Sequence, residues 1–140
     1  MNHDHSNSRF QTWAGRIISG FCALFLFFDG ATKVIKLAPV MEVCAKMGFS
    51  ASAAQAIGAV LLVCTVLYLI PQTRFLGAIL LTGYLGGAIA THVHYGSPKF
   101  ETAFPGAFGV LVWLGLYLRD HRLRQLAPIC SAREPNSEAV

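Results

Sequence analysis

Charged residues are missing from three long windows of this chain, and each window is about as long as a membrane-spanning helix. No Asp, Glu, Lys or Arg occurs from Met47 to Thr73, from Phe75 to Pro98 or from Thr102 to Leu118, and a shorter window runs from Ile17 to Phe28. A charge at the middle of a bilayer costs roughly 3 kcal/mol or more. Because a spanning helix needs about 17–25 residues, the windows predict an integral membrane protein.

The composition agrees with this interpretation. Apolar residues make up 54% of the 140 residues, and charged residues only 13%, about half their usual share of roughly 25%. The length leaves room for one domain. The net charge of +4 does not indicate nucleic-acid binding, because the arginines form no stripe with aromatic residues between them. The lipid bilayer is therefore the expected partner.

An all-α fold is predicted, a four-helix transmembrane bundle with a short interfacial amphipathic helix between helices one and two. The first uncharged window is too short to span, so helix one must continue through Asp29 and Lys33. The expected helices are 13–36, 50–70, 75–94 and 104–124, within a transmembrane domain over 12–124. Disordered cytoplasmic tails are expected over 1–11 and 125–140.

The interfacial helix is predicted over 39–47. Apolar residues recur there at i, i+3, i+4 and i+7, namely Val40, Val43, Cys44 and Met47. Pro39 suits the first turn of a helix. The pattern is typical of a helix that lies on the membrane surface, and an irregular loop is the alternative.

Basic residues are divided between the two sides of the predicted bundle. Four spans put both termini on one side, and all seven Arg fall on that side, whereas the four Lys fall on the other. The excess favours cytoplasmic termini, so the chain is expected in a bacterial inner membrane. Cys44 and Cys130 then lie on opposite sides, and Cys22 and Cys64 lie in apolar windows, so a disulfide framework is not expected.

Two pairs of small residues have the spacing of close helix packing. Gly83 and Gly87 form a G-x-x-x-G pair in helix three, and Ala54 and Gly58 form the equivalent pair in helix two. Such spacing allows two helix backbones to approach. Both pairs are predicted to pack against neighbouring helices, although the pattern names no particular partner.

Asp29 and Lys33 are the charged residues that helix one carries into the membrane. They are four residues apart in the acid-then-base order that pairs well on a helix. Counted from Ile17, Asp29 lies about 18 Å along the helix. The pair has two readings: an ion pair that orients helix one, or the polar floor of a small pocket open to the outer side.

His92 and His94 end helix three on the same side. They are two residues apart and point to roughly opposite faces, so spacing does not choose between them. Either could contact a haem or a quinone, and a histidine that faces water or headgroups is the alternative. No catalytic constellation and no metal site is recognised, the cofactor is unknown, and the chain is not expected to be an enzyme on its own.

Several motifs resemble the DoxX-like family of small four-helix membrane proteins, over about Trp13 to Arg124. They follow one another in the order of the predicted helices: Phe28-Asp29-Gly30-Ala31-Thr32-Lys33, Pro39, Gly48, Gly58, Tyr68-Leu69-Ile70-Pro71, the run Gly77 to Ala88, and Thr91-His92. The matching polar positions are Asp29, Lys33 and His92. That match, rather than helix geometry, makes His92 the preferred histidine and these three the candidate ligand-binding residues.

The resemblance implies two classes of function. The family's namesake is associated with quinone-linked sulfur oxidation, and relatives are linked to thiol and oxidative stress or to assembly of other membrane proteins. One expectation is therefore an accessory subunit of a quinone- or thiol-linked redox system, with a quinone-like ligand. The other is a non-enzymatic protein that binds a lipid-like ligand or helps to assemble a partner membrane protein. A homo-oligomer is also compatible with the chain.

Overall fold

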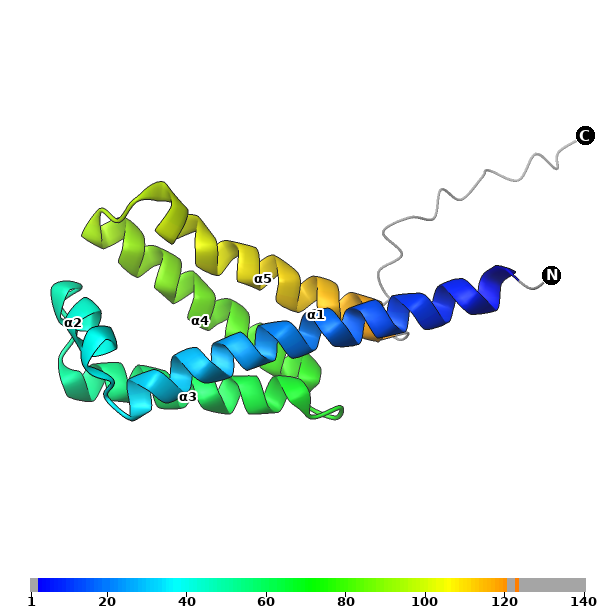
Figure 1. The fold of residues 1–140 in the computed structure, drawn as a ribbon, viewed down its shortest axis with the longest axis horizontal. Helices are drawn as coiled ribbons and strands as arrows, with labels where there is room; N and C mark the ends of the chain where they lie inside the picture. Colours follow the sequence, from blue (N-terminus) through cyan, green and yellow to red (C-terminus); the bar gives the residue numbers. More distant parts are fainter. Residues whose placement is uncertain (1–2, 121–122, 124–140) are drawn as a thin grey trace, which may run out of the picture.

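The computed structural model of the chain describes residues 3–120 and Leu123, and over these residues it contains helices and no strand (Figure 1). Four helices are long and one is short. Their bounds are His3–Val34 for α1, Ala38–Lys46 for α2, Ala51–Leu69 for α3, Arg74–Tyr95 for α4 and Lys99–Arg119 for α5. The predicted architecture, four long helices with a short one between the first and second, is confirmed.

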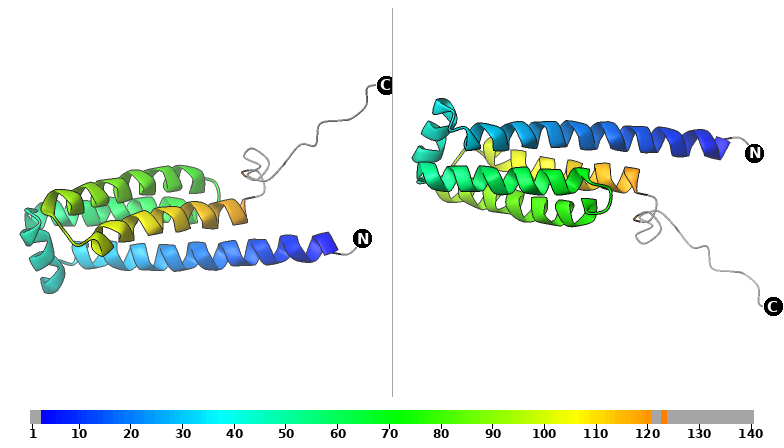
Figure 2. Two further views of the ribbon diagram at one scale, coloured as in Figure 1. Left: turned by 90° about the horizontal axis from the view of Figure 1, so that it is seen from above. Right: turned by 90° about the horizontal axis from the view of Figure 1, so that it is seen from below.

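The short helix α2 lies across one end of the bundle (Figure 2), which is called the α2 end below. Pro39 stands in its first turn, where a missing N–H costs no helical hydrogen bond. The chain enters and leaves α2 through left-handed residues, Lys36 with φ 56° and Gly48 with φ 85°. None of the α2 side chains is buried. Two sharp joints therefore hold α2 against the rest of the molecule.

Two helix boundaries differ clearly from the predicted ones. α1 begins at His3, so the residues up to Gln11, which were predicted as a disordered tail, continue the helix. No Pro or Gly occurs before Gly15 to interrupt it. α5 begins at Lys99 rather than at residue 104 and ends at Arg119 rather than at residue 124. The predicted tail over 125–140 lies outside the described residues.

Pro105 does not interrupt α5. A loop was expected before residue 104, because Gly96 and Pro98 precede it and Pro105 lies nearby. In the structure Pro105 lies inside α5 and is buried against the bundle. Membrane helices tolerate an internal Pro where neighbouring groups pack around the interrupted hydrogen bond. The preceding loop is consequently shorter than predicted, and Pro98 stands directly before the helix.

The four long helices form a ring in which each contacts two others. α1 packs against α3 and α5, and α4 packs against the same two helices, so that α1 and α4 occupy opposite corners. The α3–α4 turn, the beginning of α1 and the end of α5 lie at the end away from α2 (Figure 1). This end is called the turn end.

Small residues set the closest approaches between helices. Gly58 of α3 lies against Gly30 and Lys33 of α1, and a Cβ at Gly58 would stand 2.6 Å from the Lys33 Cβ atom. Ala54 is also buried. A Cβ at Gly77 of α4 would overlap the backbone of Tyr68 on α3. The predicted small-residue packing of helix two is therefore confirmed, with α1 as the partner.

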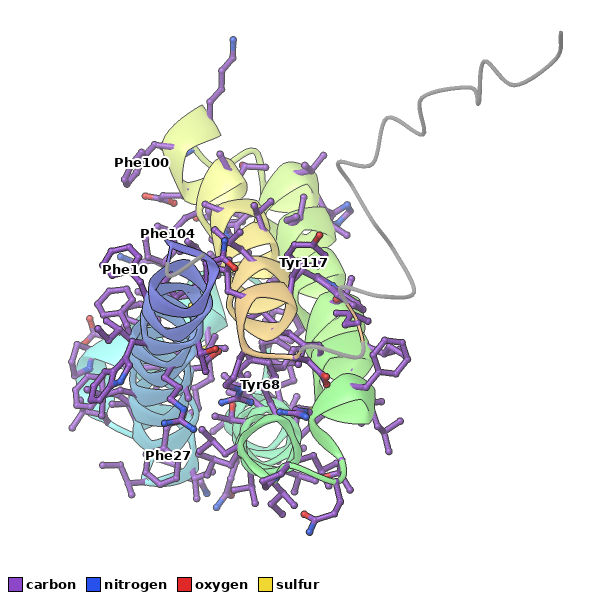
Figure 3. The ribbon with its side chains drawn as sticks, turned by 90° about the vertical axis from the view of Figure 1, so that its right-hand side faces the viewer. Phe10, Phe27, Tyr68, Phe100, Phe104 and Tyr117 are labelled. Carbon is purple, nitrogen blue, oxygen red and sulfur yellow. The ribbon has the colours of Figure 1, made fainter. Side chains whose placement is uncertain are left out.

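A buried tyrosine ties three helices together towards the turn end. The Tyr68 hydroxyl donates to the Val112 carbonyl of α5 at 2.9 Å and is paired with the Ser19 hydroxyl of α1, also at 2.9 Å. The Arg119 guanidinium lies 5.6 Å from the centre of the Tyr68 ring. Figure 3 looks along the bundle from this end and shows Tyr68 among the helices. The network fixes the helices here, where polar groups have no water to bond to.

The buried core does not extend to the α2 end along α4. Its buried residues are Gly77, Ala78, Leu81 and Leu85, and none follows Leu85. In Figure 1, α4 and α5 diverge from α1 and α3 towards α2. All four helices therefore pack tightly near the turn end, whereas near α2 the α4 and α5 helices separate from α1 and α3, which stay in contact through Gly58.

Large apolar side chains cover the outside of the bundle. Phe27 and Phe100, for example, are 48% and 78% exposed and point away from it (Figure 3). All four long helices are long and apolar enough to cross a membrane, α1 from Phe10 onwards. A surface of this kind is suited to lipid and not to water.

Candidate functional site

The candidate site begins with the two charges on α1. Asp29 Oδ2 and Lys33 Nζ form an ion pair at 2.5 Å, one helical turn apart. The Lys33 side chain is 16% exposed and that of Asp29 37%. The Lys33 stem lies against Gly58, because the missing Cβ of that glycine lets α1 and α3 approach. The predicted pair therefore forms, and helix packing fixes the position of the lysine.

His92 of α4 is held by the turn that ends its helix. Gly96 adopts the left-handed conformation with φ 76°, which reverses the chain and brings Ser97 back to the helix. The Ser97 hydroxyl lies 3.1 Å from His92 Nδ1. His92 is partly buried, whereas His94 is exposed. The structure thus separates two histidines that spacing could not distinguish.

Asp29, Lys33 and His92 line a single cavity of about 690 Å³ at the α2 end. It is named the α2 cavity here. Its walls come from α1, α2, α3, α4 and the link that follows α2. The other lining residues are Pro39, Val40, Val43, Cys44, Met47, Phe49, Ala54, Ile57, Gly83, Tyr84, Gly87, Ala88 and Thr91. Residues far apart in the sequence therefore meet where the core ends.

The α2 wall of this cavity was identified in the sequence but given another role. Val40, Val43, Cys44 and Met47, the apolar face expected to lie on lipid, all line the α2 cavity. The helix itself was predicted correctly, because its period is visible in the sequence. The surface that this face contacts depends on how far α4 lies from α1 and α3. That distance cannot be predicted from a local sequence pattern.

Gly83 and Gly87 differ from their predicted role. A Cβ added to either would have no atom within 4 Å, so neither glycine packs against a helix of this chain. Both line the α2 cavity instead. The prediction that a helix of this chain packs at this pair was therefore wrong. G-x-x-x-G spacing shows that one face of a helix carries no bulky side chains, but it does not show which neighbour covers that face.

Some of the remaining polar side chains bond between helices, and others bond within their own helix. Gln55 of α3 donates to the Val34 carbonyl of α1 at 3.3 Å, and Trp113 of α5 donates to Thr82 of α4 at 2.8 Å. Thr65 and Thr91 instead donate to carbonyls of their own helices. Tyr84 was missed as a site residue. It stands one turn before Ala88 on the α4 face that lines the cavity.

A second hollow lies between α4 and α5. It has a similar volume, about 690 Å³, and is named the α4–α5 groove. Its lining carries no charged residue and consists of Thr82, Leu85, Gly86, Ile89, Pro105, Gly106, Gly109, Val110, Trp113, Leu114, Tyr117 and Leu123. The α2 cavity, by contrast, combines apolar walls with an ion pair and a histidine, which is the usual make-up of a small-molecule site.

The described part of the chain was compared with the arrangements that metal ions and disulfides require. No group of three or more His, Cys, Asp or Glu residues there is arranged to hold a metal ion. Cys22, Cys44 and Cys64 are all free thiols, and Cys130 lies outside the described residues. The α2 cavity is suited to hydrogen-bond a polar group at Lys33 or His92 and to enclose an apolar body.

Comparison with known proteins shows to which family the chain is related. The sequence model of the DoxX-like family matches residues 17–115, which include α2, α3 and α4 and most of α1 and α5. Searches of curated proteins and of solved structures gave no match. The match agrees with the four spanning helices, so the protein is an integral membrane protein and belongs to the DoxX-like family.

Proposed function

We propose that this protein binds a small amphipathic, quinone-like molecule in the α2 cavity, as an accessory subunit of a quinone- or thiol-linked redox system. One observation carries the proposal. The ion pair of α1, His92 of α4 and the apolar face of α2 line the same cavity of about 690 Å³. Ligand sites of about 300–1,000 Å³ usually combine mainly apolar walls with a few polar groups.

The charged pair supports binding rather than packing alone. Ionisable groups inside a membrane protein are costly and usually serve a site or a path. Here Lys33 is anchored by its stem against Gly58, and its ammonium group has donors beyond the one used by Asp29. A carbonyl oxygen of the ligand would accept from Lys33 or from His92. The Asp29 carboxylate then holds the lysine ammonium group in place.

A second function is binding of a lipid-like ligand or help in assembling a partner membrane protein. The α4–α5 groove favours it, because its lining is apolar and carries no charge. An acyl chain or an apolar helix of a partner fits such a surface. The absorption spectrum of the purified protein separates the two functions, since a quinone absorbs in the near ultraviolet and a lipid does not.

The proposed location is a bacterial inner membrane with both termini in the cytoplasm. Lys33, Lys36, Lys46 and Lys99 stand at or near the α2 end, whereas Arg9, Arg16, Arg74 and Arg119 stand towards the turn end. Three more Arg follow α5 in the sequence, so seven Arg are counted against four Lys. An excess of basic residues marks the cytoplasmic side. Cys44 on α2 is then reached from outside the cell. Labelling of Cys44 by a membrane-impermeant maleimide in intact cells supports this orientation, and labelling only after permeabilisation contradicts it.

Ligand binding is tested with the purified full chain and tritiated decylubiquinone in a scintillation proximity assay. Saturable binding is expected for the wild type. Lys33→Met and the double change Asp29→Asn with Lys33→Met are expected to weaken it about tenfold or more, as for the loss of a hydrogen bond to a charged donor. Asp120→Asn is the matched control, because it breaks the Arg74–Asp120 ion pair of 3.0 Å at the turn end. Equal binding by all variants would overturn the proposal.

A further inference from the structure

Two of the open glycines of α4, Gly83 and Gly87, meet no neighbouring helix of this chain. Glycine is less favourable than alanine inside a helix, and at several other positions of this bundle a close contact accounts for it. Gly58 and Gly77 both lie where a Cβ would collide with a neighbouring helix. Gly83 and Gly87 have nothing within 4 Å of the Cβ position. Helix packing in this chain therefore does not require them.

Both glycines line the α2 cavity on its α4 side. The other walls of the cavity carry side chains of ordinary size, among them Ile57 of α3 and Val43 of α2. At Gly83 and Gly87 the wall is bare backbone. Any side chain added there would occupy space between α4 and the opposite walls. The width of the cavity beside α4 thus depends directly on these two positions.

We propose that Gly83 and Gly87 are the specificity-determining residues of the α2 cavity, and that they admit ligands whose body is a ring rather than a single unbranched chain. This inference rests on the proposed function. An unbranched chain is narrow and packs against any apolar helix face, so it needs no glycine. A ring is wider and requires the room that two missing side chains leave. The volume of about 690 Å³ accommodates such a body.

Gly86 provides a control within the same helix. It too has no atom within 4 Å of its Cβ position, but it lines the α4–α5 groove instead of the α2 cavity. A leucine at Gly86 therefore meets the same backbone and the same freedom from collisions. It differs from a leucine at Gly87 only in the hollow that it fills.

The test compares tritiated decylubiquinone, which has a ring, with tritiated dodecanoate, which is an unbranched chain. The wild type, Gly83→Leu, Gly87→Leu and Gly86→Leu are purified as the full chain and assayed by scintillation proximity. Size-exclusion elution and thermal unfolding verify that each variant is folded. Gly83→Leu and Gly87→Leu are expected to weaken ring binding about tenfold or more and to change dodecanoate binding much less. Gly86→Leu is expected to leave ring binding unchanged.

Each outcome bears on the inference. Ring binding that survives Gly83→Leu and Gly87→Leu but is lost in Lys33→Met overturns the role of the glycines and leaves the proposed function intact. An equal loss of both probes also overturns it, because the glycines would then not select for width. Absence of saturable ring binding to the wild type overturns the proposed function and this inference together.

Discussion

The Asp29–Lys33 ion pair shows how this bundle accommodates charged side chains within a helix. Lys33 is largely buried, but its partner Asp29 lies one turn away on the same helix. Intramembrane charges are usually satisfied by such partners or by water. Asp29 is 37% exposed and lines the α2 cavity. The sequence could indicate this pair, because i,i+4 spacing and the short first window are both local features.

The pair gives the first prediction. Asp29→Asn alone leaves the Lys33 charge without its partner, so it is expected to lower the free energy of unfolding by about 1 kcal/mol, a modest amount because Asp29 is partly exposed. Adding Lys33→Met should recover part of this loss, with a coupling of about 0.5 kcal/mol or more. Thermal unfolding in detergent measures both. Strictly additive losses would contradict the ion pair.

Tyr68 gives the second prediction. Tyr68→Phe removes the hydroxyl that donates to Val112 and pairs with Ser19. Two polar groups are then left in a buried position, so a loss of about 1–3 kcal/mol is expected. Tyr95→Phe is the control, because Tyr95 is 51% exposed and its change should cost almost nothing. Equal stability of the two variants would show that the Tyr68 network is not stabilising.

Some helix boundaries and helix roles in this bundle could be predicted from the sequence, and others could not. The amphipathic period of α2 and the lengths of α3 and α4 could be predicted, because both depend only on residues close together in the sequence. The start of α5 could not, because Pro105 normally ends a helix and only its packing in the bundle permits it inside one. The role of Gly83 and Gly87 was also missed, since the spacing of small residues does not record whether a neighbour is present.

The glycines give the third prediction, which compares two of them on α4. Gly77→Ala forces a Cβ into the Tyr68 backbone and is expected to cost about 1–3 kcal/mol of stability. Gly83→Ala meets open space and is expected to stabilise by up to about 1 kcal/mol, because alanine is the better helix former. Thermal unfolding of the two variants decides. A loss at Gly83 as large as that at Gly77 would mean that a helix does pack there.

The joint before α2 gives the fourth prediction. Lys36 has φ 56°, a left-handed conformation that costs a residue with a side chain about 1–2 kcal/mol. Lys36→Gly removes this strain and is expected to raise the free energy of unfolding by about 0.5–1 kcal/mol, reduced by the added freedom of the unfolded chain. Lys46→Gly inside α2 is the control and should destabilise. A destabilised Lys36→Gly variant would show that the joint is not strained.

At the scale of the whole molecule, the bundle has a tight end and an open end. The tight contacts of Gly77 and the Tyr68 network lie towards the turn end, and the α2 cavity lies where the helices separate. A rigid end that supports an open one is suited to binding. The sequence could predict that Asp29, Lys33 and His92 were candidates, but not that they share a cavity with the apolar face of α2. That arrangement depends on the ring of helices as a whole.

The position of the ligand tests the central claim most directly. The fully assembled protein is labelled with an azido derivative of decylubiquinone, irradiated and digested, and the modified residues are identified by mass spectrometry. Modification is expected in α2 and in the part of α4 from Gly83 to His92, both of which line the α2 cavity. It should be reduced by excess unlabelled decylubiquinone. Modification confined to Pro105–Tyr117 of α5, which lines the α4–α5 groove, would contradict the account.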